Sequence, residues 1–184
     1  VFIDDVLKSS GIRPRQLNAI AVSKGPGSYT GLRIGSSAAK GLAWSLEIPL
    51  IAIDTLKVLA SAVLAKHNRI LCPMLDARRM EVNTAIYDEN LRLIEPVQAM
   101  ILDEESTALF KKEKKPVFLG DGMQKCRKIL ETSIDAEFIE HSFPSAAHLG
   151  PLAFERYINK EFEDLAGFEP FYLKEFFTPI PGKK

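Results

Sequence analysis

A glycine-rich segment is the part of the sequence whose residue types and spacing point most directly to chemistry. Gly25, Gly27 and Gly31 follow a short apolar run and precede a long helical stretch. A strand-to-helix turn of this kind presents backbone N–H groups and the positive end of a helix dipole, which together can hold an anion. The spacing is GxGxxxG, one residue longer than the dinucleotide fingerprint, and no Gly-Lys-Ser/Thr follows, so it is not a P-loop either. The alternative is a tight turn with Ser28 or Thr30 as the helix N-cap.

A pair of arginines is the second candidate. Arg78 and Arg79 follow Asp76-Ala77 between two strand-like runs. Neighbouring guanidinium groups can bind phosphate or carboxylate through paired hydrogen bonds. The same residues also suit a plain polar hairpin turn. Two interpretations therefore stay open: an anion, nucleotide or partner contact, or a turn without a ligand.

Residues suited to metal or nucleophilic chemistry are few. The histidines are His67, His141 and His148, and a proline separates the last two, so they cannot form a zinc-binding HExxH pair. Cys72 and Cys126 lie far apart and in apolar surroundings, which adds no metal cluster. A Ser–His–Asp triad needs no sequence proximity and stays open, although no GxSxG elbow is present. We expect the histidines to be isolated surface residues and Cys126 to be a core residue.

Small residues recur along the helical stretch that follows the glycine segment. Gly31, Gly35, Ala39 and Ala43 are spaced by four and form a smooth ridge on one side of a helix. Each glycine lowers helix propensity by roughly 1 kcal/mol relative to alanine. The ridge allows close approach of another element, either within the domain or from a partner, and the spacing does not choose between them.

These residues depend on elements that the hydrophobic pattern predicts. The first part of the chain has strand–helix–strand spacing, which indicates a βαβ unit with parallel strands. The expected elements are a helix from residue 2 that runs out at 9–11, a strand at 18–23, a helix at 29–46, a strand at 49–53 and a helix at 55–66. Together they make an α/β fold whose first lobe spans residues 1–66.

The pattern changes after residue 67. Three strand-like runs with short polar connections favour an antiparallel meander, and two helix–strand pairs and a last helix follow. The expected elements are strands at 70–75, 81–87 and 91–97, a helix and strand at 103–112 and 116–119, a second pair at 123–130 and 136–139, and a helix opened by Ser145 towards 162. The aromatic tail, 168–177, should pack on the body. The second lobe spans residues 67–184.

Composition limits the partners. Among 184 residues, 24 Lys+Arg balance 24 Asp+Glu, and hydrophobic residues make up 46%. These are the proportions of a globular protein. A protein that binds nucleic acid alone usually has a basic excess, so autonomous RNA binding is disfavoured. The two cysteines favour a reducing cytoplasm over a disulfide framework, and no apolar run reaches the ~18 residues of a membrane span.

The glycine segment also carries a family resemblance. The run at 23–35, SKGPGSYTGLRIG, strongly resembles the TsaB (YeaZ-type) family, the small subunit of the bacterial tRNA threonylcarbamoyladenosine (t6A) machinery. Three further stretches fit the family in order: AAKGLA at 38–43, DARRMEV at 76–82 and PFYLK at 170–174. The resemblance covers nearly the whole chain.

The resemblance implies a two-lobed fold like that of actin, sugar kinases and Hsp70-type ATPases. Family members carry a strand hairpin and a third strand, with the first nucleotide-phosphate loop, ahead of the point that corresponds to residue 1. We therefore expect an incomplete N-terminal lobe and further N-terminal residues in the natural protein. The strand at 18–23 is then expected to be an exposed sheet edge.

The resemblance also implies a function. The chain is expected to be a non-catalytic activating subunit that pairs with a larger catalytic paralogue, TsaD, and acts with an ATPase, TsaE, in modifying position 37 of tRNA. It implies contact with tRNA only through the complex, a homodimer when the chain is alone, no tightly bound cofactor or metal, and ATP or ADP at the subunit interface. The alternative is a glycoprotease-like (M22-type) peptidase or an ATPase.

The family pairs through the helix that ends near Ser10 and the helix at 29–46, which adds weight to the partner interpretation of the small-residue ridge. No catalytic residue is expected. The partner-interface residues that the resemblance implies are Val6, Ser28, Tyr29, Thr30, Gly31, Leu32, Arg33, Gly35, Ala39 and Ala43.

Overall fold

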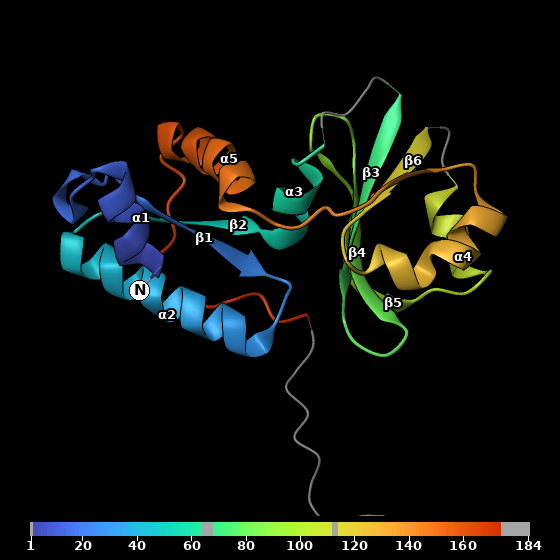
Figure 1. The fold of residues 1–184 in the computed structure, drawn as a ribbon, viewed down its shortest axis with the longest axis horizontal. Helices are drawn as coiled ribbons and strands as arrows, with labels where there is room; N and C mark the ends of the chain where they lie inside the picture. The colour runs from blue at the N-terminus through green and yellow to red at the C-terminus, as the bar shows by residue number, and fades with distance from the viewer. Residues whose placement is uncertain (1, 64–67, 112–113, 174–184) are drawn as a thin grey trace, which may run out of the picture.

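The chain forms an α/β structure with two separate sheets. A computed structural model describes residues 2–63, 68–111 and 114–173. A two-stranded sheet and a five-stranded sheet each have their own helices, and the two groups lie side by side as two lobes (Figure 1). The last helix returns to the lobe in which the chain begins (Figure 1).

The two-stranded sheet comes from the predicted βαβ unit, which is confirmed. The elements of this part are α1 (Phe2–Ser10), β1 (Ile20–Gly25), α2 (Tyr29–Leu46), β2 (Leu50–Asp54) and α3 (Thr55–Ala60). β1 and β2 pair in parallel, with Ile20 opposite Leu50. In the described part of the chain β1 pairs with β2 alone, so no strand pairs with its other edge, as the resemblance implies.

Helices cover the two faces of this small sheet. α2 packs on one face, where Ala39 and Ala43 meet Leu50 and Ala52 of β2. α5 (Ala146–Ile158) packs with β2 in a second cluster that joins Leu152 and Ala153 to Ile51, Ile53 and Val58. Because both faces of β2 are covered, its first four residues are all buried, as in the strands of parallel sheets generally.

The five-stranded sheet has the order β5-β4-β3-β6-β7. Its strands are β3 (Arg69–Asp76), β4 (Glu81–Tyr87), β5 (Leu93–Ile101), β6 (Lys115–Leu119) and β7 (Glu137–Ile139). β3, β4 and β5 form the predicted antiparallel meander, and β6 and β7 add to β3 in parallel. α4 (Met123–Ser133) packs on this sheet through Met123, Cys126 and Leu130, so Cys126 is a core residue as predicted.

Three predicted helices differ from those observed. The expected helix at 103–112 is a short 3₁₀ helix, η2 (Ser106–Phe110), because Asp103 and Ser106 exchange backbone-to-side-chain hydrogen bonds of 2.8 Å that close a local turn first. The helix expected at 55–66 is observed only to Ala60, and residues 64–67 lie outside the described part. The last helix ends at Ile158, short of 162.

Candidate partner-binding surface

The glycine segment forms a tight turn between β1 and α2. Gly25 has φ +121°, and a Cβ there would lie 2.5 Å from the carbonyl oxygen of Phe171, so only glycine fits. Ser28 caps α2, because its hydroxyl accepts a hydrogen bond of 3.3 Å from the N–H of Gly31. This confirms Ser28 as the N-cap, one of the two residues that the sequence offers for that role.

The segment 164–173 lies against α2 as a strap. The Lys40 ammonium group donates hydrogen bonds to the carbonyl oxygens of Ala166 (3.2 Å) and Phe168 (2.9 Å). Phe168 is buried in the cluster beneath α2, and the N–H of Phe171 donates to the carbonyl oxygen of Lys24 at 2.7 Å. The tail therefore packs on the body as predicted up to residue 173, and its remainder lies outside the described residues.

An aromatic and cationic stack fastens the end of this strap. The rings of Tyr29 and Tyr172 lie with centroids 4.8 Å apart, and the Arg33 guanidinium lies 4.2 Å from the centroid of the Tyr29 ring. Arg33 also donates to the Tyr172 hydroxyl at 3.3 Å, and this hydrogen bond raises the pKa of Arg33. Tyr29 and Arg33 thus both contact the chain's own tail; their predicted role in partner contact stays a prediction.

The small-residue ridge of α2 divides into an inner and an outer part. Ala39 and Ala43 are 6% and 0% exposed and pack inside the chain. A Cβ at Gly35 would meet no atom within 4 Å, and one at Gly31 would meet only Ser28, its own N-cap. The outer part therefore has open space beside it, while the inner part is already used by the fold.

α2 also exposes large apolar side chains that the sequence analysis did not single out. Ile34 is 67% exposed and Trp44, the chain's single tryptophan, is 77% exposed. The charged residues of α2 are Arg33 and Lys40, and the strap engages both. The 18-residue helix therefore carries only two charged side chains, of which Arg33 stays exposed beside the strap, and this is few for a helix in contact with water. A helix of this length with so few charges is the signal that could have found it.

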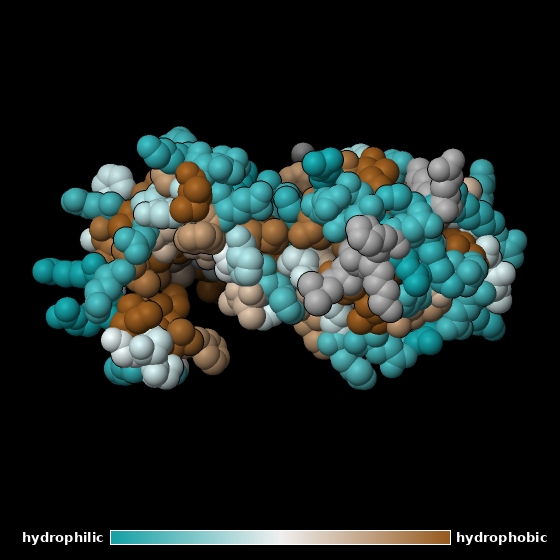
Figure 2. Space-filling view, turned by 90° about the horizontal axis from the view of Figure 1, so that it is seen from above, coloured by the Kyte–Doolittle hydropathy of each residue, from teal (hydrophilic) through white to brown (hydrophobic). Residues whose placement is uncertain are grey.

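α1 adds to this apolar surface. No residue of α1 is buried, and Phe2, Ile3 and Val6 are 86%, 48% and 64% exposed. α1 lies at the same end of the molecule as α2 (Figure 1). Seen from above, on the side of α5, this lobe shows more hydrophobic surface than the other lobe, which is mostly hydrophilic (Figure 2). We name these exposed residues the α1–α2 surface: Phe2, Ile3, Val6, Ile34 and Trp44.

The arginine pair lies apart from that surface, on the turn between β3 and β4. Arg78 and Arg79 have φ of 70° and 50°, left-handed conformations that a hydrogen-bonded turn must hold. The ammonium group of Lys125 donates to the Asp76 carboxylate at 2.5 Å and to the carbonyl oxygens of Arg79 and Glu81. The hydrogen bond from Lys125, and then that from the Arg78 N–H, lower the pKa of Asp76.

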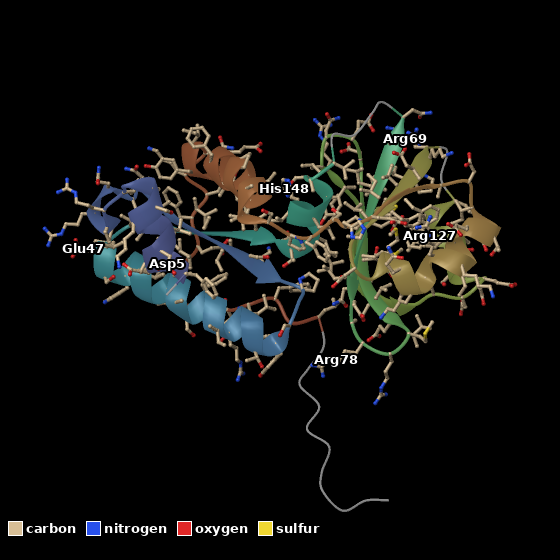
Figure 3. All side chains as sticks on the ribbon, in the orientation of Figure 1. Asp5, Glu47, Arg69, Arg78, Arg127 and His148 are labelled. Carbon is tan, nitrogen blue, oxygen red and sulfur yellow. The ribbon has the colours of Figure 1, made fainter. Side chains whose placement is uncertain are left out.

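The two guanidinium groups themselves are exposed. Among the described residues, neither Arg78 nor Arg79 makes a side-chain hydrogen bond or ion pair. Figure 3 shows Arg78 at the lower end of the hairpin. The turn is confirmed, and the anion or partner contact stays a prediction.

The remaining candidate residues form no metal or thiol centre in the described part of the chain. There, no group of three or more His, Cys, Asp or Glu side chains could hold a metal ion. His141 is exposed and His148 lies partly buried in α5, where α5 meets α3 (Figure 3), whereas His67 lies outside the described residues. Cys72 and Cys126 are buried in one apolar cluster, and burial raises the pKa of both thiols.

None of the helices described has the length and hydropathy to cross a bilayer.

The fold defines a class of protein, the two-lobed α/β proteins, with an architecture consistent with that of actin, sugar kinases and Hsp70. A solved structure described as an uncharacterized protein with similarity to peptidase YEAZ, from Pseudomonas aeruginosa, superimposes with a TM-score of 0.76 over 94% of this chain and 81% of its own, at 23% identity. At this identity the likeness concerns the fold.

Sequence comparisons give the family. The family model described as TsaD, tRNA N6-adenosine threonylcarbamoyltransferase, matches residues 1–175. The tRNA threonylcarbamoyladenosine biosynthesis protein TsaB of Bacillus subtilis is 35% identical over 181 residues, which are 94% of this chain and 76% of that protein. TsaB of Escherichia coli is 31% identical over 199 residues, 99% of this chain and 82% of its own. The chain belongs to the TsaB (YeaZ-type) family, within the larger group that the TsaD model describes.

Proposed function

We propose that this chain is a non-catalytic subunit in the biosynthesis of t6A at position 37 of tRNA. It pairs through the α1–α2 surface with a larger TsaD-like paralogue that transfers the threonylcarbamoyl group, and it acts with a TsaE-like ATPase. The observation that carries this proposal is the exposure of two large apolar side chains, Ile34 and Trp44, on α2, a helix with only two charged residues. An apolar helical face that its own chain leaves open is typical of a protein interface.

The residues on this surface are of the kinds that contribute most to binding. Interface hot spots are enriched in tryptophan, and such a residue contributes about 2 kcal/mol or more when a partner covers it. Full burial of an exposed isoleucine side chain adds about 1.5–3 kcal/mol. Gly35, which has open space beside it, and Gly31, where an added Cβ would meet only Ser28, would let a partner helix approach the backbone of α2 closely.

The charge balance of the chain fits a subunit that does not itself hold the RNA. The chain has 24 basic and 24 acidic residues, and this balance suits a subunit whose partner holds the tRNA. When the partner is absent, a second copy can cover the same apolar surface, so we expect a homodimer. The exposed Arg78 and Arg79, which lie apart from the α1–α2 surface, are the proposed contact for an anion, a nucleotide or a further partner. Two unpaired buried thiols suit a cytoplasmic complex.

Reconstitution tests the proposal. The TsaD-like and TsaE-like proteins, with tRNA, ATP and threonylcarbamoyl donor, are assayed for t6A with and without this chain. We expect modified tRNA only when the chain is present. Fluorescence of Trp44 reports pairing directly, since burial at an interface should shift its emission to shorter wavelength.

The same preparation tests the alternative activities. The isolated chain is assayed for bound metal, peptide hydrolysis and ATP turnover. A stoichiometric metal, or turnover that a single carboxylate substitution abolishes, would contradict the non-catalytic role and support the peptidase or ATPase. Full t6A formation without the chain would contradict the partner role.

A further inference from the structure

A groove lies between α5 and the β4–β5 hairpin, formed by residues that the α1–α2 surface does not include. Two adjoining cavities, of about 300 and 560 Å³, share Asp54, Lys57, Leu152 and Glu155 in their walls. The end of β2 supplies Asp54, α3 supplies Lys57, and α5 supplies the other two. The hairpin completes the larger cavity with Tyr87, Asn90, Leu91, Arg92, Leu93 and Val97. The volume falls in the range of small-molecule sites, about 300–1,000 Å³.

Three charged side chains of the groove have no partner within the described part of the chain. Within the ranges that the structure describes, the side chains of Lys57, Arg92 and Glu155 take part in no hydrogen bond or ion pair. Arg156, the next residue of α5, behaves differently, since it binds the carbonyl oxygen of Ala52 and two glutamate carboxylates. Two cations and one carboxylate in the groove therefore keep their hydrogen-bonding capacity for a ligand.

A tyrosine hydroxyl adds a third kind of group. Tyr87 is 3% exposed, with its ring in the apolar cluster of the larger sheet, yet it lines the larger cavity. Its hydroxyl has no hydrogen-bond partner among the residues described and is not one of the fully buried polar atoms, so it is open to the cavity. Burial, and then the nearby charge of Asp54, raise the pKa of Tyr87, so the hydroxyl keeps its proton and remains a donor.

The lining selects a ligand with both charges and an apolar part. An anion alone would meet the carboxylates of Glu155 and Asp54, and a cation alone would meet Lys57 and Arg92. Neither would use the apolar wall that Leu91, Leu93, Val97 and Leu152 provide. A ligand with one carboxylate, one ammonium group and an aliphatic side chain satisfies all of these groups.

We propose that this groove binds an α-amino carboxylate, either a free aliphatic amino acid or a short peptide of such residues. The carboxylate of the ligand binds Lys57 and Arg92, its ammonium group binds Glu155, and the Tyr87 hydroxyl donates to a carbonyl or carboxylate oxygen. The inference goes beyond the proposed pairing function and does not depend on it, because no residue of the α1–α2 surface lines the groove.

Isothermal titration calorimetry on the full chain tests this site. The probes are L-leucine, tri-leucine and N-acetyl-L-leucinamide, which keeps the side chain but lacks both charges. We expect saturable binding of L-leucine or tri-leucine, and binding of the uncharged amide at least tenfold weaker. L-Leucine alone would identify a free amino acid as the source, and tri-leucine alone a peptide.

Variants assign the binding to the groove. Lys57→Met, Glu155→Gln and Tyr87→Phe should each weaken binding by about tenfold or more, whereas the exposed Lys128→Met on α4 should leave it unchanged. Circular dichroism confirms that each variant is folded. No saturable binding of either zwitterion at millimolar concentration would overturn the proposal. So would equal binding of the uncharged amide, or affinities that the groove variants do not change.

Discussion

Leucine substitutions at Gly35 and Ala39, two positions of the α2 ridge, should change the free energy of unfolding in opposite directions. At Gly35 a new Cβ meets no atom within 4 Å, so a side chain can be added without a clash. Leucine also removes a mid-helix glycine, which should raise the free energy of unfolding by about 0.5–1 kcal/mol. Ala39 is 6% exposed and packs in the cluster with Leu50 and Phe168. The carbons that leucine adds there overpack the core and should lower the free energy of unfolding by about 1–3 kcal/mol.

The same pair of variants separates folding from pairing. Urea denaturation followed by circular dichroism gives the stability of each, and titration with the TsaD-like subunit gives the affinity. Gly35→Leu should fold and yet pair about 100-fold more weakly, because its side chain holds the partner helix away; Gly35→Ala is the matched smaller change. If Gly35→Leu fails to fold, or pairs as the wild type does, the outer ridge is not a pairing surface.

Three further predictions concern the rest of the fold. Phe168→Ala should lower the free energy of unfolding by about 3–5 kcal/mol, measured by urea denaturation, because it empties the core beneath α2. The hydrogen bond from Lys125 lowers the pKa of Asp76 in the folded state. The pair therefore stabilises the fold at pH values above the unfolded pKa of Asp76, and this contribution is lost as the pH falls through the lower folded pKa. Lys125→Met should reduce this loss of stability at acid pH, measured as the free energy of unfolding against pH. Cys72 and Cys126 should react with a thiol reagent only after unfolding, since burial raises both pKa values.

The sequence predicted those elements whose hydrophobic pattern is local and strong. Residues 81–87 were expected as a strand and form β4 with those bounds, and 70–75 became β3 (Arg69–Asp76). Both sides of β3 are covered, which gives a continuous apolar run at 70–75. In β4 the polar residues Glu81, Asn83 and Thr84 interrupt the apolar ones. Ser28 could be predicted as a cap because a hydroxyl just before a helix can accept from its first free N–H groups.

Contacts between distant residues could not be predicted in this way. Lys40 binds Phe168 across 128 residues, and Lys125 holds the turn at Asp76 across 49; no local pattern encodes either pair. The exposure of side chains could not be predicted either. In the sequence Ile34 and Trp44 look like ordinary apolar helix residues, and only the structure shows that both are exposed. The low charge of the α2 sequence could have pointed to this surface, but only the fold shows which apolar side chains stay exposed.

Pairing through α2 is tested most directly by calorimetric titration of the TsaD-like subunit with Ile34→Asp, using Ile101→Asp as the matched control. Both isoleucines are similarly exposed, 67% and 62%, but Ile101 lies on β5 in the other lobe. We predict that Ile34→Asp weakens the affinity by at least about 100-fold, about 2.7 kcal/mol, while Ile101→Asp pairs as the wild type does. Unchanged affinity for Ile34→Asp, or an equal loss for both variants, would contradict the assignment of α1 and α2 as the pairing surface.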